Sequence, residues 1–311
     1  MLVTKAERVR CRSVNAIAEE HAASLVDLSE TAYAGALSMA CKDILLQQRH
    51  VVFLTGPSGS GKTTTALRLQ DLLRRNGKRA VGVSLDSFYL PREETPVWDN
   101  GHPNFETIEA LDLDYIDRCA RELRTDRHTE LPVYEFRKGG RQAYTVPLSV
   151  DDDTYLIVEG IHALNPRLTG LFPSGDAAKI YVSAHTDFVD DEGNFVLMAQ
   201  ELRLMRRLIR DLTERGVPID ETLMFWDDVC RGERAYIRPY RSNADIHINS
   251  THYYEPLLYK NILLAVLEKN PPSEQYEPVV EKLRAALTHF DAIESWLLPQ
   301  HSMLREFLPK L

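Results

Sequence analysis

One stretch, Gly56-Pro57-Ser58-Gly59-Ser60-Gly61-Lys62-Thr63-Thr64, constrains this chain more than any other. It fits the pattern G-x-x-x-x-G-K-[ST], and the sequence on both sides fits as well. Residues 50–55 are apolar and β-branched, as a buried parallel strand should be, and residues 64–73 have the apolar spacing of a helix. A strand, a glycine loop and a helix in this order predict a site for nucleotide phosphates, and a glycine turn without a ligand is the weaker alternative.

The loop residues also predict how phosphates would be held. Three glycines let the backbone curl with its N–H groups pointing inward, and the start of the helix adds the positive end of its dipole. Lys62 supplies a positive charge for the β- and γ-phosphates, and the hydroxyl of Thr63 is a ligand for Mg²⁺. The predicted nucleotide-binding residues of the loop are Gly56, Ser58, Gly59, Ser60, Gly61, Lys62, Thr63 and Thr64.

The composition narrows the class of protein. The 311 residues include 46 acids against 37 lysines and arginines, and the net charge of −9 argues against a nucleic-acid-binding surface. The four cysteines lie far apart without a C-x-x-C pair, which is typical of reduced thiols in a cytosolic protein. No apolar run approaches membrane-spanning length. We therefore predict a cytoplasmic protein that acts on a small molecule, and the sequence is compatible with a homo-oligomer.

Two carboxylates follow predicted strands. Residues 79–85 form a buried strand that ends at Asp86, and residues 154–158 form another that ends at Glu159. In an open α/β sheet the carboxyl ends of the strands face the ligand crevice. Asp86 would either take a proton from an attacking hydroxyl or cap the following loop, and the spacing does not separate these roles. Glu159 is the candidate that helps to hold Mg²⁺.

A run of arginines lies in a predicted helix. Arg203, Arg207 and Arg210 recur at positions i, i+4 and i+7 and therefore share one face, and Arg206 lies off that face. Several arginines on one face repel each other unless an anion lies opposite, so the pattern favours phosphate binding. The alternative is a solvated helix whose arginines are neutralised by the neighbouring acids Glu201, Asp211 and Glu214.

Helical patterns lie on both sides of the central region. Residues 13–48 are rich in Ala, Leu and Glu, and two further helical segments lie near the C-terminus. We therefore predict a helical extension over residues 1–48 and a second one over residues 251–311, packed on the domain between them. That domain, residues 49–250, would carry the phosphate loop and a helical lid at about residues 187–216.

The motifs together resemble the uridine kinase and phosphoribulokinase family of P-loop kinases over about residues 51–249. In the family's order they are GPSGSGKTT at 56–64, LDSFY at 85–89, LPVYEF at 131–136, VEG at 158–160, RRLIRD at 206–211, ERG at 214–216 and AD at 244–245. The tail SMLREF at 302–307 also looks like the end of bacterial uridine-kinase-like proteins with extra N-terminal sequence. The resemblance implies an α/β fold of the P-loop NTPase type, with three layers, a mostly parallel sheet and a helical lid.

The resemblance also implies an activity. Proteins of this family transfer a phosphoryl group from ATP or another nucleoside triphosphate, with Mg²⁺, to a hydroxyl, which for a nucleoside such as uridine or cytidine is the ribose 5′-OH. Asp86 falls at the position of the family's general base, and Glu159 matches its Mg²⁺-associated acid. Arg207, Arg210 and Arg215 match lid arginines that reach the acceptor and the phosphates.

The acceptor residues match the family less well. Phe105 and Glu106 fall where nucleoside kinases hold the sugar, and Tyr134 would stack on a base. The histidine that reads the pyrimidine in uridine-cytidine kinases is replaced by Gly139, and Arg141, two positions on, is a further substrate-binding candidate. A kinase of another small alcohol, such as a sugar phosphate, glycerate or pantothenate, therefore stays open, and a nucleotide-responsive binding module is the alternative of a different class.

One insertion separates this chain from the short uridine kinase form. The acidic turn from Asp187 to Asn194 lengthens the connection into the lid, and we expect it to reshape the acceptor pocket.

Overall fold

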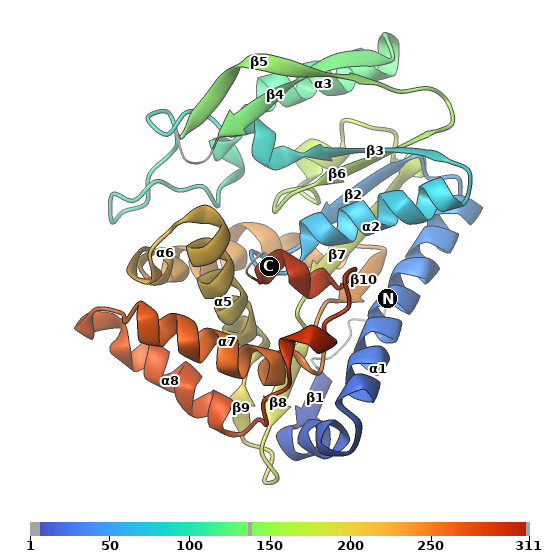
Figure 1. The fold of residues 1–311 in the computed structure, drawn as a ribbon. Coiled ribbons are helices and arrows are strands. Elements are labelled where there is room, and N and C mark those ends of the chain that lie inside the picture. The colour runs from blue at the N-terminus through green and yellow to red at the C-terminus, as the bar shows by residue number, and fades with distance from the viewer. Residues whose placement is uncertain (1–6, 136–138, 309–311) are drawn as a thin grey trace.

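A computed structural model describes residues 7–135 and 139–308. The helices are α1 Cys11–Leu46, α2 Lys62–Arg75, α3 Leu113–Thr125, α4 Pro166–Thr169, α5 Ala199–Arg210, α6 Ile219–Gly232, α7 Glu255–Lys269 and α8 Glu277–Thr288. The strands are β1 Glu7–Arg10, β2 Val51–Thr55, β3 Arg79–Ser84, β4 His128–Glu135, β5 Gly140–Ser149, β6 Thr154–Glu159, β7 Ala177–Ser183, β8 Thr186–Val189, β9 Phe195–Leu197 and β10 Ile246–Asn249. Figure 1 shows their arrangement.

The centre of the fold is a parallel sheet with the order β10-β7-β2-β6-β3. Strand β2 lies in the middle and is buried at every position, because both faces of the sheet are covered. Val52 and Leu54 pack into the core shared with α1, α2, α5 and α7, whereas Val51 and Phe53 pack against α3 on the other face. The predicted three-layer α/β fold with a mostly parallel sheet is confirmed.

The strand order creates the crevice for the site. The chain leaves β2 towards β3 and β6 on one side and returns to β7 and β10 on the other side. Connections that diverge in this way leave a gap beyond the carboxyl ends of the strands, where α/β proteins bind their ligands. The turn after β2 is the phosphate loop, so the topology places that loop at the gap.

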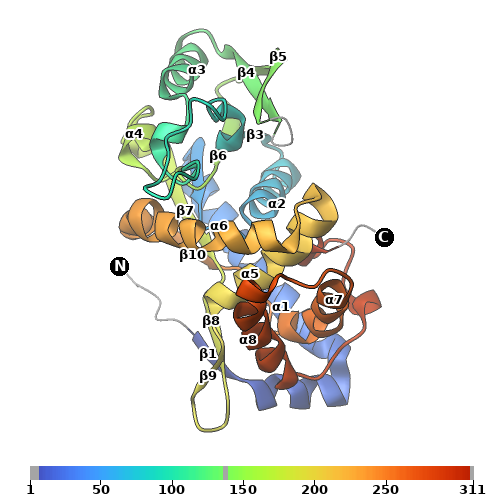
Figure 2. The same cartoon turned by 90° about the vertical axis from the view of Figure 1, so that its left-hand side faces the viewer.

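The predicted N-terminal helix is present as α1, with a kink at His21, where φ is −153° and ψ is 80°. Before it lies β1, which was not predicted and which pairs with β8 in a small sheet completed by β9. The first three residues of the predicted acidic turn, 187–189, belong to β8, and residues 190–194 join β8 to β9. Within this connection Asp191 pairs with Arg12. Both views show this small sheet at the opposite end of the molecule from α3, β4 and β5 (Figures 1 and 2).

The prediction that the acidic turn reshapes the acceptor pocket is therefore wrong. Within the described part of the chain, residues 187–194 contribute nothing to the lining of the large cavity at the phosphate loop. The physical reason is that β8 and β9 pair with β1 rather than with the central sheet, and this pairing holds the insertion beside α1.

The C-terminal segment packs on the central α/β domain. Helix α7 lies against α5 and α8, and both views place α7 and α8 beside α5 (Figures 1 and 2). After α8 the chain returns to the phosphate loop and buries Met303, Leu304 and Phe307. Over residues 7–135 and 139–308, no helix is long and apolar enough to cross a membrane.

Candidate functional site

The phosphate loop has the backbone geometry that its glycines allow. Gly59 and Gly61 have φ values of +74° and +80°, a left-handed conformation that other residues adopt at a cost. Gly56 is required for a different reason, because a Cβ atom there would lie 1.9 Å from the carbonyl oxygen of Val182. Helix α2 begins at Lys62, so the free N–H groups of its first turn face the end of the loop.

Arginines of α5 hold the loop from outside. Arg203 donates to the carbonyl oxygen of Ser58 at 3.0 Å, and Arg206 donates to that of Gly59 at 2.9 Å. Arg207 donates to the Ser58 hydroxyl at 2.7 Å. With these carbonyl groups satisfied from outside, the N–H groups of the loop are left for a ligand.

The predicted anion-binding role is wrong for Arg203. Its side chain is buried and pairs with Glu233, and it stacks on Trp226 rather than facing the cavity. Arg206, which lies off the predicted face, is fully buried and pairs with Glu255 of α7. The helical spacing correctly groups residues by face, but the packing of α6 and α7 decides which face meets the cavity.

A cavity of about 1240 Å³ opens above the loop. It brings together most of the residues that the sequence singles out: Ser58, Gly59, Gly61, Lys62, Thr63, Asp86, Phe105, Glu106, Tyr134, Glu159, Arg207, Arg210 and Arg215. Among the described residues, five candidates are outside this lining: Gly56, Ser60, Thr64, Arg141 and Arg203. Gly56 and Ser60 are buried within the loop, whereas Thr64 binds the C-terminal segment.

The two strand-end carboxylates lie close together because their strands are neighbours. Ser84 is opposite Glu159 in the β3–β6 pairing, and the Ser84 hydroxyl donates to Glu159 Oε1 at 2.7 Å. The same hydroxyl accepts from the N–H group of Asp86 at 3.4 Å. Burial, reinforced by the negative charge of Asp86, raises the pKa of Glu159, and burial lowers the pKa of Lys62. The serine therefore positions both acids at the edge of the cavity that contains Lys62.

The part of the cavity around Phe105 and Glu106, predicted to hold the acceptor, combines aromatic rings with an acid. The centre of the Tyr89 ring lies 5.6 Å from the ring centre of Phe105 and 5.9 Å from the ring centre of Tyr134. Glu106 lines the same region, and its Oε2 atom is buried without a hydrogen-bond partner among the described residues. Burial raises the pKa of Glu106 to about 7, although the positive charges of Arg207 and Lys62 oppose this shift.

Arg141 does not take part in this site. Its guanidinium donates to Asp112 Oδ2 at 2.8 Å and to the carbonyl oxygen of Phe88 at 3.1 Å, and it lies over the ring of Tyr115. The prediction of a substrate-binding role is wrong, because the residue ties the β4–β5 hairpin to the start of α3. Nothing in the sequence near position 141 indicates the partner at Asp112.

The remaining arginines of the predicted lid surround one acid. Asp211 Oδ1 lies 2.7 Å from Arg210 Nη2 and 3.6 Å from Arg215 Nε, and its Oδ2 lies 3.4 Å from Arg207 Nη2. The alternative of a solvated helix is wrong, because Arg210 is buried and the side chain of Arg207 is largely buried, although Asp211 does reduce their repulsion. These arginines line the cavity, and their binding of phosphate stays a prediction. The chain at Asp211–Arg215 continues α5 as a π-helix, an irregularity that is common at functional sites.

Glu306 and Gly232 are among the residues at the site that reasoning from the sequence missed. Glu306 lines the cavity and accepts a hydrogen bond from Thr64 Oγ1 at 2.6 Å. Gly232, the last residue of α6, lies against Glu106. The tail motif around Glu306 is a sequence signal, but it carries no indication of a contact with the phosphate loop.

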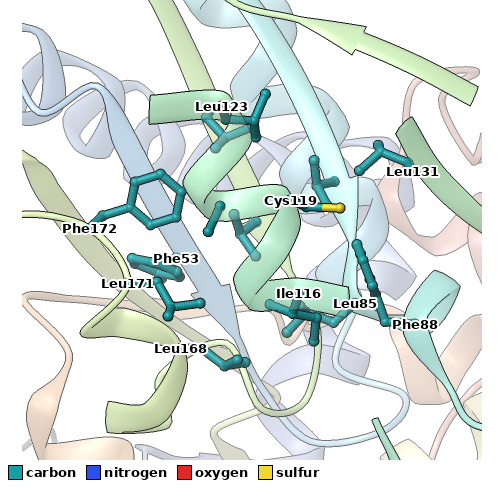
Figure 3. A pocket seen from close by; sticks show the side chains of 14 residues that line it. Phe53, Leu85, Phe88, Ile116, Cys119, Leu123, Leu131, Leu168, Leu171 and Phe172 are labelled. Atoms are coloured by element: carbon teal, nitrogen blue, oxygen red, sulfur yellow. The ribbon is translucent and has the colours of Figure 1, made fainter. Parts of the chain in front are cut away.

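A second cavity, of about 40 Å³, lies between α3 and the sheet. Figure 3 shows its lining of apolar side chains, among them Phe53, Leu85, Ile116, Leu168 and Phe172, with the sulfur of Cys119. The described lining has no charged side chain, and its one thiol, of Cys119, already donates to the carbonyl oxygen of Glu130 at 3.7 Å, so this cavity offers little to orient a polar ligand. We interpret it as an imperfection of core packing.

The oxygen atoms at the site fit Mg²⁺. Thr63 supplies a hydroxyl and Glu159 a carboxylate, and both line the cavity. Among the described residues, no group of three or more His, Cys, Asp or Glu side chains forms a metal cage. Mg²⁺ commonly binds to one or two protein oxygens and completes its shell with phosphates and water, so this small ligand set is suitable.

Comparisons with known proteins agree with this geometry. A sequence profile described as "Phosphoribulokinase / Uridine kinase family" matches residues 51–254. The uridine kinase of Bacillus velezensis is 28% identical over 200 residues, which cover 64% of this chain and 84% of that protein. The uridine kinase of Saccharomyces cerevisiae is 29% identical over 209 residues, which cover 65% of this chain and 37% of that protein.

Among solved structures, the phosphoribulokinase from Rhodobacter spheroides is similar to this chain with a TM-score of 0.44 and 20% identity. The match covers 65% of this chain and 70% of that one.

Proposed function

Because the chain belongs to the phosphoribulokinase and uridine kinase family, we propose that it transfers the γ-phosphate of ATP to the 5′-OH of a nucleoside. Uridine and cytidine are the first candidates for that nucleoside. Membership of a P-loop kinase family implies ATP-dependent phosphoryl transfer to a small molecule. The choice of a nucleoside is our own inference from the acceptor half of the cavity.

The observation that carries this proposal is the carboxylate of Glu106. One of its oxygens is buried and has no partner among the described residues, and buried polar groups of this kind normally have one. A carboxylate in this state is suited to accept hydrogen bonds from the two neighbouring hydroxyls of a ribose. Phe105 and Tyr134 line the same region and offer ring faces on which a base could stack.

The charges of the acceptor half favour a neutral acceptor. The cavity lining includes the carboxylates Glu106, Glu135, Glu221 and Asp228 and the exposed Arg92, and Arg207 is the lid arginine whose charge acts on Glu106. An acceptor that already carries a phosphate or carboxylate would need cations close to that group. This supports a nucleoside over a sugar phosphate, glycerate or pantothenate.

The residues of this chain take the following proposed roles. Asp86 receives the proton of the attacking hydroxyl, and Lys62 stabilises the negative charge that develops on the transferred group. Arg207, Arg210 and Arg215 approach the phosphates when the lid closes. Thr63 and Glu159 would hold Mg²⁺, which when bound neutralises charge on the phosphates.

A second candidate is a kinase of another small alcohol within the same family. Gly139 favours it, because a glycine that lines the cavity provides no side chain to read the edge of a base. A nucleotide-responsive binding module is less well supported, since a switch needs no acceptor base at the position of Asp86.

A panel of acceptors tests the proposal. The full chain is mixed with ATP and Mg²⁺ and with uridine, cytidine, 2′-deoxyuridine, ribulose 5-phosphate, glycerate or pantothenate, and the products are identified by mass spectrometry. We expect a nucleoside 5′-monophosphate, and a lower kcat/KM for the deoxynucleoside, which lacks one of the hydroxyls assigned to Glu106. Phosphorylation of an anionic acceptor alone would replace the nucleoside proposal by the second candidate.

A further inference from the structure

The C-terminal segment brings a carboxylate to the phosphate loop. Glu306 Oε2 accepts hydrogen bonds from the backbone N–H group of Thr64 at 3.3 Å and from its hydroxyl at 2.6 Å. Thr64 lies in the first turn of α2, where free N–H groups and the positive end of the helix dipole attract anions. Glu306 thus occupies donors that a phosphate oxygen of the nucleotide could use.

The position of this carboxylate is fixed by its neighbours in the sequence. Met303 and Phe307 are fully buried on either side of it. Met303 packs on the loop, because its sulfur lies 2.5 Å from the place where a Cβ atom of Gly61 would be. The ring centre of Phe307 lies 5.1 Å from the guanidinium carbon of Arg206, and Arg206 donates to the carbonyl oxygen of Gly59. Figure 1 shows this segment, in red, beside the start of α2.

The carboxylate also faces the charges that a nucleotide needs. Glu306 lines the same cavity as Lys62, Thr63 and the lid arginines. Two anions cannot share the Thr64 donors, and at a few ångströms the charges of a phosphate and a carboxylate repel each other. Binding of a phosphate at Thr64 therefore requires the Glu306 side chain to leave.

We propose that Glu306 is an intramolecular competitor of the donor's phosphates and lowers the affinity of the loop for ATP. The side chain swings away from Thr64 when a phosphate binds, while the buried side chains of Met303 and Phe307 keep the segment in place. The inference rests on the nucleotide-binding half of the proposed function and is independent of the acceptor.

Calorimetric titration of the full chain with ATP and Mg²⁺, without acceptor, tests this proposal. Glu306→Gln removes the charge and keeps the volume, and Glu306→Ala removes the hydrogen bonds as well. We expect both variants to bind ATP roughly tenfold more tightly than the unaltered chain, because one repulsive charge and one competitor are lost. Glu294→Gln, which changes an exposed acid of the same C-terminal region, is the matched control and should leave the affinity unchanged.

Unchanged or weaker binding in Glu306→Gln would overturn the proposal and would make Glu306 neutral to the nucleotide or a part of its site. An equal gain in Glu294→Gln would overturn it too, because net charge would then explain the effect. Thermal unfolding shows whether each variant folds. If the alanine variant does not fold, the ATP affinity of Glu306→Gln alone tests the proposal. Tripolyphosphate in place of ATP should show the same gain, since the competition concerns phosphate oxygens. A failed acceptor panel would leave these binding measurements intact.

Discussion

Glu106 and Gly232 lie in direct contact, although they come from a loop and from the end of α6. A Cβ atom at Gly232 would lie 2.1 Å from the Cβ atom of Glu106, far inside van der Waals contact. The Cβ atom of Glu106 is fixed to the backbone, so a rotation of the side chain cannot relieve the overlap. The absence of a side chain at position 232 is therefore what allows the acid to line the cavity.

The substitution Gly232→Ala tests this relationship. We expect the overlap to displace Glu106 and to lower kcat/KM for the acceptor by about 10- to 100-fold, because small displacements of positioning groups are costly. Gly35→Ala is the matched control, since Gly35 also lies in a helix and the described structure has no heavy atom within 4 Å of its Cβ position. Alanine should favour that helix by about 1 kcal/mol and leave activity unchanged. Unaltered acceptor kinetics in Gly232→Ala would remove Glu106 from the acceptor site.

The role of Asp86 is tested by Asp86→Asn. The amide cannot accept the proton of the attacking hydroxyl, so turnover should fall by about 10²- to 10⁴-fold. ATP binding, measured by calorimetry, should stay close to that of the unaltered chain, because Lys62 and the backbone of the loop are unchanged. Near-normal turnover would remove Asp86 from the role of general base.

The pKa of Glu106 predicts a dependence of stability on pH. Burial raises this pKa from 4.5 to about 7, so the folded chain binds the proton more tightly than the unfolded chain. The contribution of Glu106 to the free energy of unfolding therefore falls as the pH rises from about 4.5 to about 7. Glu106→Gln cannot ionise, and its Tm at pH 8 should exceed that of the unaltered chain by about 2–4 °C, with little difference at pH 4.

The control for this experiment is Glu109→Gln. A hydrogen bond from Thr107 lowers the pKa of Glu109. The contribution of Glu109 to the free energy of unfolding is therefore larger at high pH than at low pH, opposite to that of Glu106. The variant should gain no stability at pH 8. A lower Tm of Glu106→Gln at pH 8 would mean that the charge of Glu106 stabilises the folded chain.

The buried pair of Arg206 and Glu255 predicts a large effect on stability. Both side chains are fully buried, and Arg206 Nε lies 2.9 Å from Glu255 Oε2. Arg206→Met leaves a buried acid without its partner, which should lower the free energy of unfolding by about 3–5 kcal/mol in urea titrations. Arg12→Met, which breaks an exposed pair with Asp191, should change it by less than about 1 kcal/mol. Equal effects of the two substitutions would refute the structural role of Arg206.

For Arg141 we predict an effect on stability and almost none on acceptor binding. Because it binds Asp112 and the Phe88 carbonyl group instead of lining the cavity, Arg141→Met should change the acceptor KM by less than about threefold. Its effect should appear as a loss of about 1 kcal/mol in the free energy of unfolding. Tyr134→Ala is the comparison, since loss of a stacking ring should raise the acceptor KM by roughly tenfold or more. A large rise in KM for Arg141→Met alone would restore its predicted role.

The sequence by itself determined the elements whose signals are local. The strand, loop and helix around residues 51–75 could be predicted because glycine conformations, apolar spacing and the helix start are properties of adjacent residues. The ends of β3 and β6 could be predicted for the same reason, and they place Asp86 and Glu159 at one edge of the sheet. The order of the motifs then indicated the family that the profile match shows.

Only the tertiary structure decided which of these residues face the cavity. Helical spacing groups Arg203 with Arg207, but the packing of Glu233 of the segment after α6 against Arg203 draws it away from the cavity. Glu306 is distant in sequence from Thr64, and no local pattern records their contact. A side chain's neighbours depend on how whole elements pack, and that packing is set by the burial of many residues together rather than by the sequence around any one of them.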